Sequence, residues 1–330
     1  MFDIIAVGSA TLDVFVETDI KYVRCRHKVD EYHFPAGSKI LVKHLEFSTG
    51  GSGMNTAVSF ARLGLKTAYL GKIGTDNAAR EIITELKKEK VDTSLIKQNN
   101  SYTTGYSTII DARGEDRTIF AYKGSISTLA FDEIDRKKLA KTRWIYMSTL
   151  IGKSFNTAKQ IAKFARKKDI KLAFNASPYL AEKGVKQLST ILKNTDLFVL
   201  SREEAELLTK KKKQPEQLKS LQKFGIEYIA ITDGSKAIFA SHNRIETVLY
   251  KITPKRAKVK ETTGAGDAFA SALLAGIIKT NNFPYSLQLA VTNAQSVIQH
   301  RGAKNILLDW SKLTKHVAHH RLFTDIWAGR

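Results

Sequence analysis

The residues ETTGAGD at positions 261–267 run directly into an apolar, helix-forming stretch at 268–278. Two glycines at a helix start allow a tight backbone turn with exposed NH groups, and the positive end of the helix dipole favours an anion such as a phosphate. Asp267, one step into the turn, is a poor phosphate ligand but a good acceptor for the proton of an attacking hydroxyl. Taken alone, the segment also fits a glycine-rich N-cap in which Asp267 only serves the dipole.

Short apolar runs elsewhere in the chain predict buried strands, because each is rich in β-branched or aromatic residues and is followed by a turn-forming or polar residue. They lie at 4–7, 68–70, 144–147, 171–174, 197–200 and 228–231. Helical patterns alternate with them at 54–63, 77–88, 155–166 and 202–208, with Asp76 as the predicted N-cap of the second. This alternation predicts an α/β fold, a three-layer α/β/α sandwich with a mostly parallel central sheet.

Two stretches break the alternation. The residues from about 14 to 49 and from about 102 to 123 show period-two patterns of β-forming residues that are joined by turn residues. These strands do not fit the parallel sheet. We therefore predict a small second sheet, built by both insertions at one edge of a single domain that spans residues 1–330. Such a sheet is expected to act as a lid that excludes water from a reaction site.

Composition narrows the class of protein. The chain has 330 residues, 43% of them apolar and 26% charged, which suffices to bury a large core. The single cysteine, Cys25, leaves no partner for an intrachain disulfide, and the apolar run at the N-terminus lacks the basic leader of a signal peptide. No apolar stretch reaches the ~20 residues that cross a bilayer. We expect a cytoplasmic protein with no membrane partner.

The net charge of +21 makes nucleic acid a partner to consider, because such a charge attracts polyanions. The basic residues fall in scattered runs between apolar segments, however, and no aromatic, zinc-finger or heptad pattern of a nucleic-acid-binding module accompanies them. Charge of this kind supports solubility and anionic substrates equally well. We therefore expect no specific nucleic-acid partner.

The segment at 261–267 resembles the second signature of the ribokinase-like (PfkB) kinase family, in which Gly-Ala-Gly-Asp forms an anion hole and carries the catalytic base. The residues GGSGMNTA at 50–57, followed by an amphipathic run that ends in Arg-Leu-Gly at 62–64, resemble the first signature. The two segments stand in the family's order, about 210 residues apart. The resemblance implies a ribokinase-like fold with a β-sheet lid.

The resemblance also implies a catalytic group and a substrate-binding group. The catalytic group is the base Asp267 with the anion-hole residues Gly264, Ala265 and Gly266. The residues expected to contact substrate hydroxyls are Asp13, Gly50, Gly51 and Asn55. Read from the residues alone, Asp13 also fits a turn or cap aspartate, and Asn55 also fits a polar residue in the first turn of a helix.

Further matches imply a site for ATP and Mg²⁺. Thr232-Asp233-Gly234 resembles a nucleotide-binding Thr-x-Gly turn, and Asn293 falls in the region that lines the adenine pocket, although an exposed polar helix residue is the other interpretation. Ser201-Arg-Glu-Glu204 resembles an Asn-x-x-Glu motif in which serine replaces the asparagine. Glu204 can still hold hydrated Mg²⁺, which needs few protein ligands, or it can be an ordinary first-turn glutamate.

Three other sequence patterns are weaker indications of a functional site. The residues IGKS at 151–154 lack the glycine that a P-loop needs at position 147, which is Met147. His316, His319 and His320 could share one helix face and bind a metal, but a polar C-terminal helix explains them more simply. Cys25 falls in the predicted lid with no base evident beside it.

The predicted reaction is transfer of the ATP γ-phosphoryl group to a hydroxymethyl group of a small sugar or nucleoside. Ser52, which stands where ribokinase-type sequences usually have lysine, resembles the family's nucleoside kinases, so both substrates stay open. Arg117 and Lys123 in the second insertion either reach phosphates or an anionic substrate, or lie on a solvated strand edge. A homodimer through the lid is a further expectation. A catalytically silent, polyanion-binding scaffold is the alternative from another class.

Overall fold

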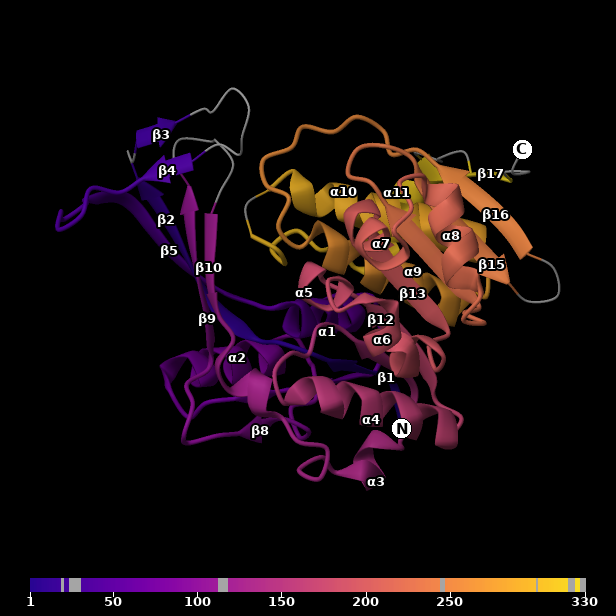
Figure 1. Cartoon of the computed structure of the whole chain (residues 1–330), viewed down its shortest axis with the longest axis horizontal. Helices are drawn as coiled ribbons and strands as arrows, with labels where there is room; N and C mark the ends of the chain where they lie inside the picture. The colour runs from indigo at the N-terminus through magenta and orange to yellow at the C-terminus, as the bar shows by residue number, and fades with distance from the viewer. Residues whose placement is uncertain are drawn as a thin grey trace.

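A nine-stranded sheet forms the middle of the computed structural model, which describes residues 1–18, 21–23, 31–111, 118–243, 247–300, 302–319 and 324–326 (Figure 1). The parallel strands are β1 (Phe2–Val7), β6 (Thr67–Leu70), β11 (Thr142–Met147), β12 (Lys171–Asn175), β13 (Leu197–Ser201) and β14 (Tyr228–Thr232). The antiparallel edge is β15 (Ile238–Asn243), β16 (Thr247–Ile252) and β17 (Thr324–Ile326). The order is β17-β16-β15-β14-β13-β12-β11-β1-β6.

Helices cover both faces of this sheet (Figure 1). One layer contains α1 (Ser52–Arg62), α2 (Asn77–Lys88), α9 (Ala265–Thr280), α10 (Phe283–Ile298) and α11 (Trp310–His319). The other contains η1 (Gly124–Thr128), α3 (Arg136–Leu139), α4 (Ser154–Lys167), α5 (Pro178–Ala181), α6 (Gly184–Leu192), α7 (Arg202–Thr209) and α8 (Gln214–Gln222). Strand β1 shows why both layers are needed, because Ile4 and Ala6 face one core and Ile5 and Val7 the other.

The predicted three-layer α/β/α fold is thus confirmed, and each predicted strand of the parallel sheet lies within an observed one. The three antiparallel strands were not predicted. β15 follows β14 through the turn at 233–237, where a short connection reverses the chain instead of crossing over through a helix. β16 follows β15 along the chain, and β17 joins this edge only after α11.

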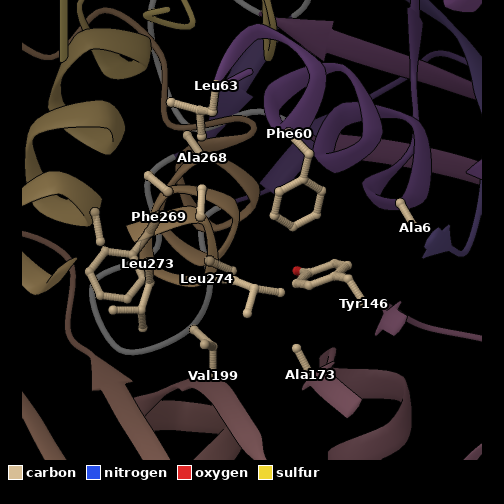
Figure 2. Packing of buried hydrophobic residues seen from close by; sticks show 14 of the residues in the cluster. Ala6, Phe60, Leu63, Tyr146, Ala173, Val199, Ala268, Phe269, Leu273 and Leu274 are labelled. Atoms are coloured by element: carbon tan, nitrogen blue, oxygen red, sulfur yellow. The ribbon is translucent and has the colours of Figure 1, made fainter. Parts of the chain in front are cut away.

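Helix α9 is buried along most of its length, from Ala268 to Ile277. Figure 2 shows Leu274 next to the ring of Tyr146, which β11 supplies, while Val199 comes from β13. The Tyr146 ring meets the Phe60 ring of α1 edge to face, with 5.4 Å between the ring centroids. A helix that is apolar all round must be surrounded by other elements. This packing fixes the axis of α9 and therefore the position of its N-terminus.

A second, four-stranded sheet lies at one edge of the molecule (Figure 1). It consists of β2 (Thr11–Thr18), β5 (Val42–Gly50), β9 (Gly105–Asp111) and β10 (Thr118–Tyr122), in the order β10-β9-β2-β5. We call it the lid sheet. Two short pairs accompany the sheets, β3 (Lys21–Val23) with β4 (Glu31–His33) and β7 (Lys72–Ile73) with β8 (Lys97–Gln98). Cys25, Arg117 and His320 lie outside the described residues.

The described residues contain neither a membrane-spanning helix nor a cluster of metal ligands. No helix in that part of the chain is long and apolar enough to cross a membrane. Within the same residues, no group of three or more His, Cys, Asp or Glu side chains could hold a metal ion. His316 and His319 do lie on α11, as the polar C-terminal helix interpretation expected.

Asp76 joins the lid sheet to the helical layer. As predicted, it is the N-cap of α2, where its Oδ1 accepts a hydrogen bond from Ala79 N at 2.9 Å. The same carboxylate accepts hydrogen bonds from Thr104 N and Thr104 Oγ1, both at 2.7 Å, just before β9 begins. Burial alone would raise the pKa of Asp76, but the hydrogen bonds from Thr104 and Ala79 outweigh it and lower the pKa.

We expect Asp76→Ala to lower the free energy of unfolding by about 1–3 kcal/mol, because it removes a helix cap and two further hydrogen bonds. Denaturant unfolding measures this. Since the folded pKa lies below the unfolded one, the contribution of Asp76 is present above the unfolded pKa and disappears as the pH falls through the folded pKa. The control is Asp135→Ala, which removes an exposed cap of the short helix α3. Equal losses in the two variants would contradict the anchoring role of Asp76.

Candidate active site

The carboxyl-terminal edge of the parallel strands gathers most of the predicted site residues. Asp13 follows β1, Glu204 follows β13, and Thr232 ends β14 just before Gly234. Ligands of open α/β sheets bind at this edge, because the chain leaves the sheet there in loops and helix N-termini. Asp267 reaches the same region at the start of α9.

The N-terminus of α9 forms an open backbone cradle. Gly264 is its N-cap with φ +79°, and a side chain there would collide with Ala303, since a Cβ would lie 2.5 Å from that of Ala303. Nothing lies within 4 Å of the position that a Cβ on Gly266 would take. The first NH groups of a helix have no acceptor within it, so this turn can offer them to an anion. Ala265 N is only weakly engaged, at 3.3 Å from Thr262 O.

Two side chains of α1 hold the carboxylate of Asp267. Ser52 Oγ donates to Oδ1 at 2.5 Å, and Asn55 Nδ2 donates to Oδ2 at 2.9 Å. Burial raises the pKa of Asp267 to about 6, although both hydrogen bonds favour the charged form and oppose the rise. A base with a pKa near 6 is ionised at neutral pH and still accepts a proton readily. The N-termini of α1 and α9 therefore meet at a carboxylate suited to proton transfer.

The loop Gly50-Gly51 brings a second carboxylate, Asp13 of β2, to the same place. A Cβ on Gly50 would lie 1.8 Å from Asp13 Oδ2, so only glycine fits there, and Gly51 has φ +91°. Burial raises the pKa of Asp13, while hydrogen bonds from Thr11 and Ser107 and the charges of Lys304 and Lys123 oppose the rise. The glycine loop thus runs between Asp13 on one side and the start of α1, which holds Asp267, on the other.

Lys304 is part of this arrangement, although no sequence pattern singled it out. It is 3% exposed. Its Nζ donates to the carbonyl and hydroxyl oxygens of Thr49, the latter at 2.7 Å, and lies 3.0 Å from Glu85 Oε1 of α2. The preceding residue, Ala303, packs on Gly264. Ala303 therefore contacts the anion cradle, and Lys304, the next residue, contacts the end of strand β5 in the lid sheet.

Asn293 has a different position from the one expected. It is fully buried in α10, which contradicts the exposed-helix interpretation. Its Nδ2 donates to Ala268 O at 3.0 Å, and its Oδ1 accepts from Leu308 N at 3.2 Å. Because both amide atoms are used inside the protein, this side chain fixes the first turn of α9 against α10. In contrast, Gly234 lies in an open turn with φ +53° and nothing within 4 Å of its Cβ position.

Glu204 forms a capping box at the start of α7. Its Oε2 accepts a hydrogen bond from Ser201 N at 2.9 Å, and Ser201 Oγ accepts one from Glu204 N at 3.2 Å. Burial raises the pKa of Glu204 to about 7, against the effect of the Ser201 hydrogen bond. Burial raises the pKa of the Tyr146 hydroxyl, and the charges of Asp267 and Glu204 raise it further. Both carboxylates therefore lie near this side chain. A divalent cation nearby would favour the ionised form of such a carboxylate and oppose the effect of burial on its pKa.

Comparison with known proteins shows to which family the chain belongs. Residues 12–310 match the model of the pfkB family carbohydrate kinases. The chain belongs to this family. It is 29% identical to an uncharacterised sugar kinase of Archaeoglobus fulgidus, over 75% of this chain and 97% of that protein. It is 26% identical to a 5-dehydro-2-deoxygluconokinase of Halalkalibacterium halodurans, over 93% and 91% of the two chains.

The fold of the kinase is also that of solved relatives. The structure of Arabidopsis thaliana ribokinase, complexed with ribose and ATP, superposes with a TM-score of 0.78 at 20% identity and covers 95% of this chain and 98% of that one. The fold shared at this low identity confirms the ribokinase-like architecture with its small separate sheet.

The titration of Asp267 predicts how the activity of the kinase depends on pH. We expect kcat/KM to fall below pH about 6, because the base must be ionised to accept a proton. Ser52→Ala removes a hydrogen bond that favours the ionised form, so it should raise the pKa of Asp267 and move this acid limb to higher pH.

The matched control is Thr56→Val on the same helix, whose hydroxyl bonds to backbone carbonyls and not to Asp267. Initial rates across pH 4.5–9 measure all three profiles. An acid limb that Ser52→Ala leaves in place would show that another group controls it.

Proposed function

We propose that this kinase transfers the γ-phosphoryl group of ATP to a hydroxymethyl group of a small sugar. The observation that carries the proposal is the carboxylate of Asp267, held by Ser52 and Asn55 beside the open first turn of α9. A base and an anion cradle at one helix start are what phosphoryl transfer to a hydroxyl requires. The family is one of carbohydrate kinases, and the Arabidopsis ribokinase structure contains ribose and ATP.

In this mechanism the sugar lies over the glycine loop, with its hydroxyls bound by Asp13 and by the backbone of Gly50 and Gly51. Asp267 accepts the proton of the attacking hydroxyl. The NH groups of Gly264, Ala265 and Gly266 stabilise the charge that develops on the phosphoryl oxygens. Asn55, whose amide nitrogen is committed to Asp267, contributes by orienting the base, and its buried Oδ1 has no partner among the described residues, which leaves it free for a substrate hydroxyl.

The nucleotide would bind along the turn that Thr232 and Gly234 form, where the open space above Gly234 lets a ligand approach the backbone. Asn293 supports this side indirectly, by fixing α9. Glu204 would hold Mg²⁺ through water molecules. The cation would supply charge neutralisation for the phosphates and would also favour the ionised form of Glu204, whose pKa burial raises to about 7.

The comparisons favour a sugar over a nucleoside, because the curated relatives are named as sugar kinases. They also disfavour a silent polyanion-binding scaffold. The cradle and the base remain together and open in this chain, whereas a scaffold would have no need of a desolvated carboxylate beside a helix N-terminus.

We further propose that residues 1–330 act as one domain whose lid is built by the insertions at about 14–49 and 102–123. Asp13 and Ser107 point to one face of the lid sheet, because they are directly paired in the parallel register of β2 and β9. That face therefore carries substrate-binding groups, and closing it over the site would exclude water from the reaction.

Replacing the base provides the direct test. Asp267→Asn should lower kcat by roughly 10²- to 10⁴-fold while ATP binding stays close to normal, because the amide cannot accept the proton. Turnover of a sugar panel with Mg²⁺ and ATP, together with calorimetric ATP binding, measures both properties. Asp309→Asn, at the start of α11, is the matched control and should turn over normally. Full activity of Asp267→Asn would remove the basis of the proposal.

The opposite face of the lid sheet is apolar and exposed, and we propose that it pairs two copies of the chain. Phe47, Val14, Thr108 and Phe120 form one row across the sheet. Leu45, Phe47, Phe120 and Tyr122 are each about half exposed. An exposed apolar patch of this kind marks an interaction surface.

This pairing predicts a dimer in sedimentation velocity that Phe47→Asp converts to a monomer, because a buried unpaired carboxylate is costly. Phe34→Asp, at an equally exposed position outside the lid sheet, should leave the dimer intact. A wild-type chain that sediments as a monomer at micromolar concentration would disprove the interface.

A further inference from the structure

Lys123 is a partly buried ammonium group that lacks an anionic partner. It lies where β10 leaves the lid sheet, immediately before η1. Its Nζ lies 5.1 Å from the centre of the Tyr179 ring of α5. Within the described part of the chain, no carboxylate lies within ion-pair distance of this nitrogen and no group accepts a hydrogen bond from it. Burying an ammonium group without such a partner is costly, so the absence needs an explanation.

Lys123 follows the lid sheet and lies near enough to Asp13 for their charges to interact. Asp13 is paired with Ser107, and Ser107 with Ala121, so these three side chains share the inner face. Lys123 comes two residues after Ala121, where the chain has left β10 and begins η1. Between Lys123 and Thr11 stands Gly105, where a Cβ would lie 3.0 Å from Thr11 Cγ2 and 3.2 Å from Lys123 O. The backbone at Lys123 therefore packs closely against Gly105 and Thr11, and the Thr11 hydroxyl donates a hydrogen bond to Asp13.

The charged side chains near Asp13 differ in how many hydrogen-bond and ion-pair partners they have. The Asp13 carboxylate is used by hydrogen bonds from Thr11 and Ser107. Lys304, the other cation near it, is bound to Thr49 and Glu85. Burial lowers the pKa of Lys123, and the charge of Asp13 only partly offsets this. Among the residues that the structure describes, Lys123 is therefore the one cation at the proposed sugar site whose N–H groups have no acceptor.

We propose that Lys123 binds an anionic substituent of the sugar, so that the kinase prefers an acidic sugar to a neutral one. This inference rests on the proposed sugar-kinase function and deepens it. The hydroxyls of such a substrate face Asp13, and its anionic group pairs with Lys123 at the end away from the phosphorylated hydroxymethyl group. A charge-assisted hydrogen bond then satisfies a group that a neutral sugar leaves unpaired. One ammonium group matches the single charge of a carboxylate, and a sugar phosphate shares the same chemistry.

Matched substrates separate the charge from the sugar. Ribonate and ribitol differ only in whether the first carbon is a carboxylate or a hydroxymethyl group, and gluconate and glucitol form a second such pair. Ribose 1-phosphate keeps its terminal hydroxymethyl group and tests a phosphate instead. With Mg²⁺ and ATP, we expect kcat/KM to be roughly 10-fold or more higher for an acidic member than for its neutral partner. The arm with the larger preference identifies the anion.

Lys123→Met should abolish this preference by raising KM for the anionic substrate while leaving KM for its neutral partner unchanged. Lys123→Arg keeps the charge and should retain most of the preference. The matched control is Lys159→Met, because Lys159 also lies over an aromatic ring, at 4.3 Å from the centre of Phe155, but it belongs to α4 and not to the lid sheet. It should change neither constant.

Two results would overturn the assignment and leave the kinase function intact: equal kcat/KM for acidic and neutral partners, or an equal loss for both partners in Lys123→Met. If no substrate of the panel is phosphorylated, the proposed function itself fails. Calorimetry then still decides the role of Lys123, because gluconate, ribonate and ribose 1-phosphate should bind the wild-type chain more tightly than Lys123→Met. Equal binding by the two chains would refute the anion site.

Discussion

The structure depends on keeping one charged carboxylate, that of Asp267, at the point where the N-termini of α1 and α9 meet. Ser52 and Asn55 donate to it from α1, and burial raises its pKa to about 6. Such a group is costly unless the elements around it are rigid. The apolar packing of α9 against Tyr146, Phe60 and the sheet provides this rigidity, and Asn293 fixes the first turn of the helix from the other side.

Acidic and basic side chains lie close to one another on the side of the site that the lid sheet forms. The charges of Lys304 and Lys123 both act on Asp13, and Lys304, which comes from a loop far away in the sequence, pairs with Glu85. Because Ala303 touches the anion cradle and Lys304 holds the carbonyl of Thr49, this loop links the proposed phosphate end to the proposed sugar end. Because Lys304 is already paired with Glu85, Lys123 is the cation that we propose for binding the substrate.

The site residues were predictable to very different degrees. The glycines at 50, 51 and 264 were predicted because their motifs resemble the family's two signatures. Gly51 and Gly264 have a positive φ, whereas at Gly50 a side chain would collide with Asp13. Glu204 was placed correctly at the start of a helix, where it closes a capping box with Ser201. Of the two interpretations of Asn293, burial in α10 contradicts the exposed helix residue, and the placement beside the adenine pocket stays a prediction. The sequence did not predict Lys304 as a site residue, because a lysine in a loop usually lies in solvent.

Read without coordinates, the chain already determined the alternation of strands and helices, the parallel part of the sheet, the separate lid strands and the glycine-rich helix start at Asp267. These features are local, since they depend on hydrophobic period and on the backbone conformations of single residues. The tertiary structure alone decided the antiparallel edge, the donors to Asp267 and the unequal surroundings of Lys123 and Lys304. Contacts between residues more than 200 positions apart, such as Ser52 with Asp267 and Thr49 with Lys304, leave no periodic trace, because burial and pairing arise only when the layers pack.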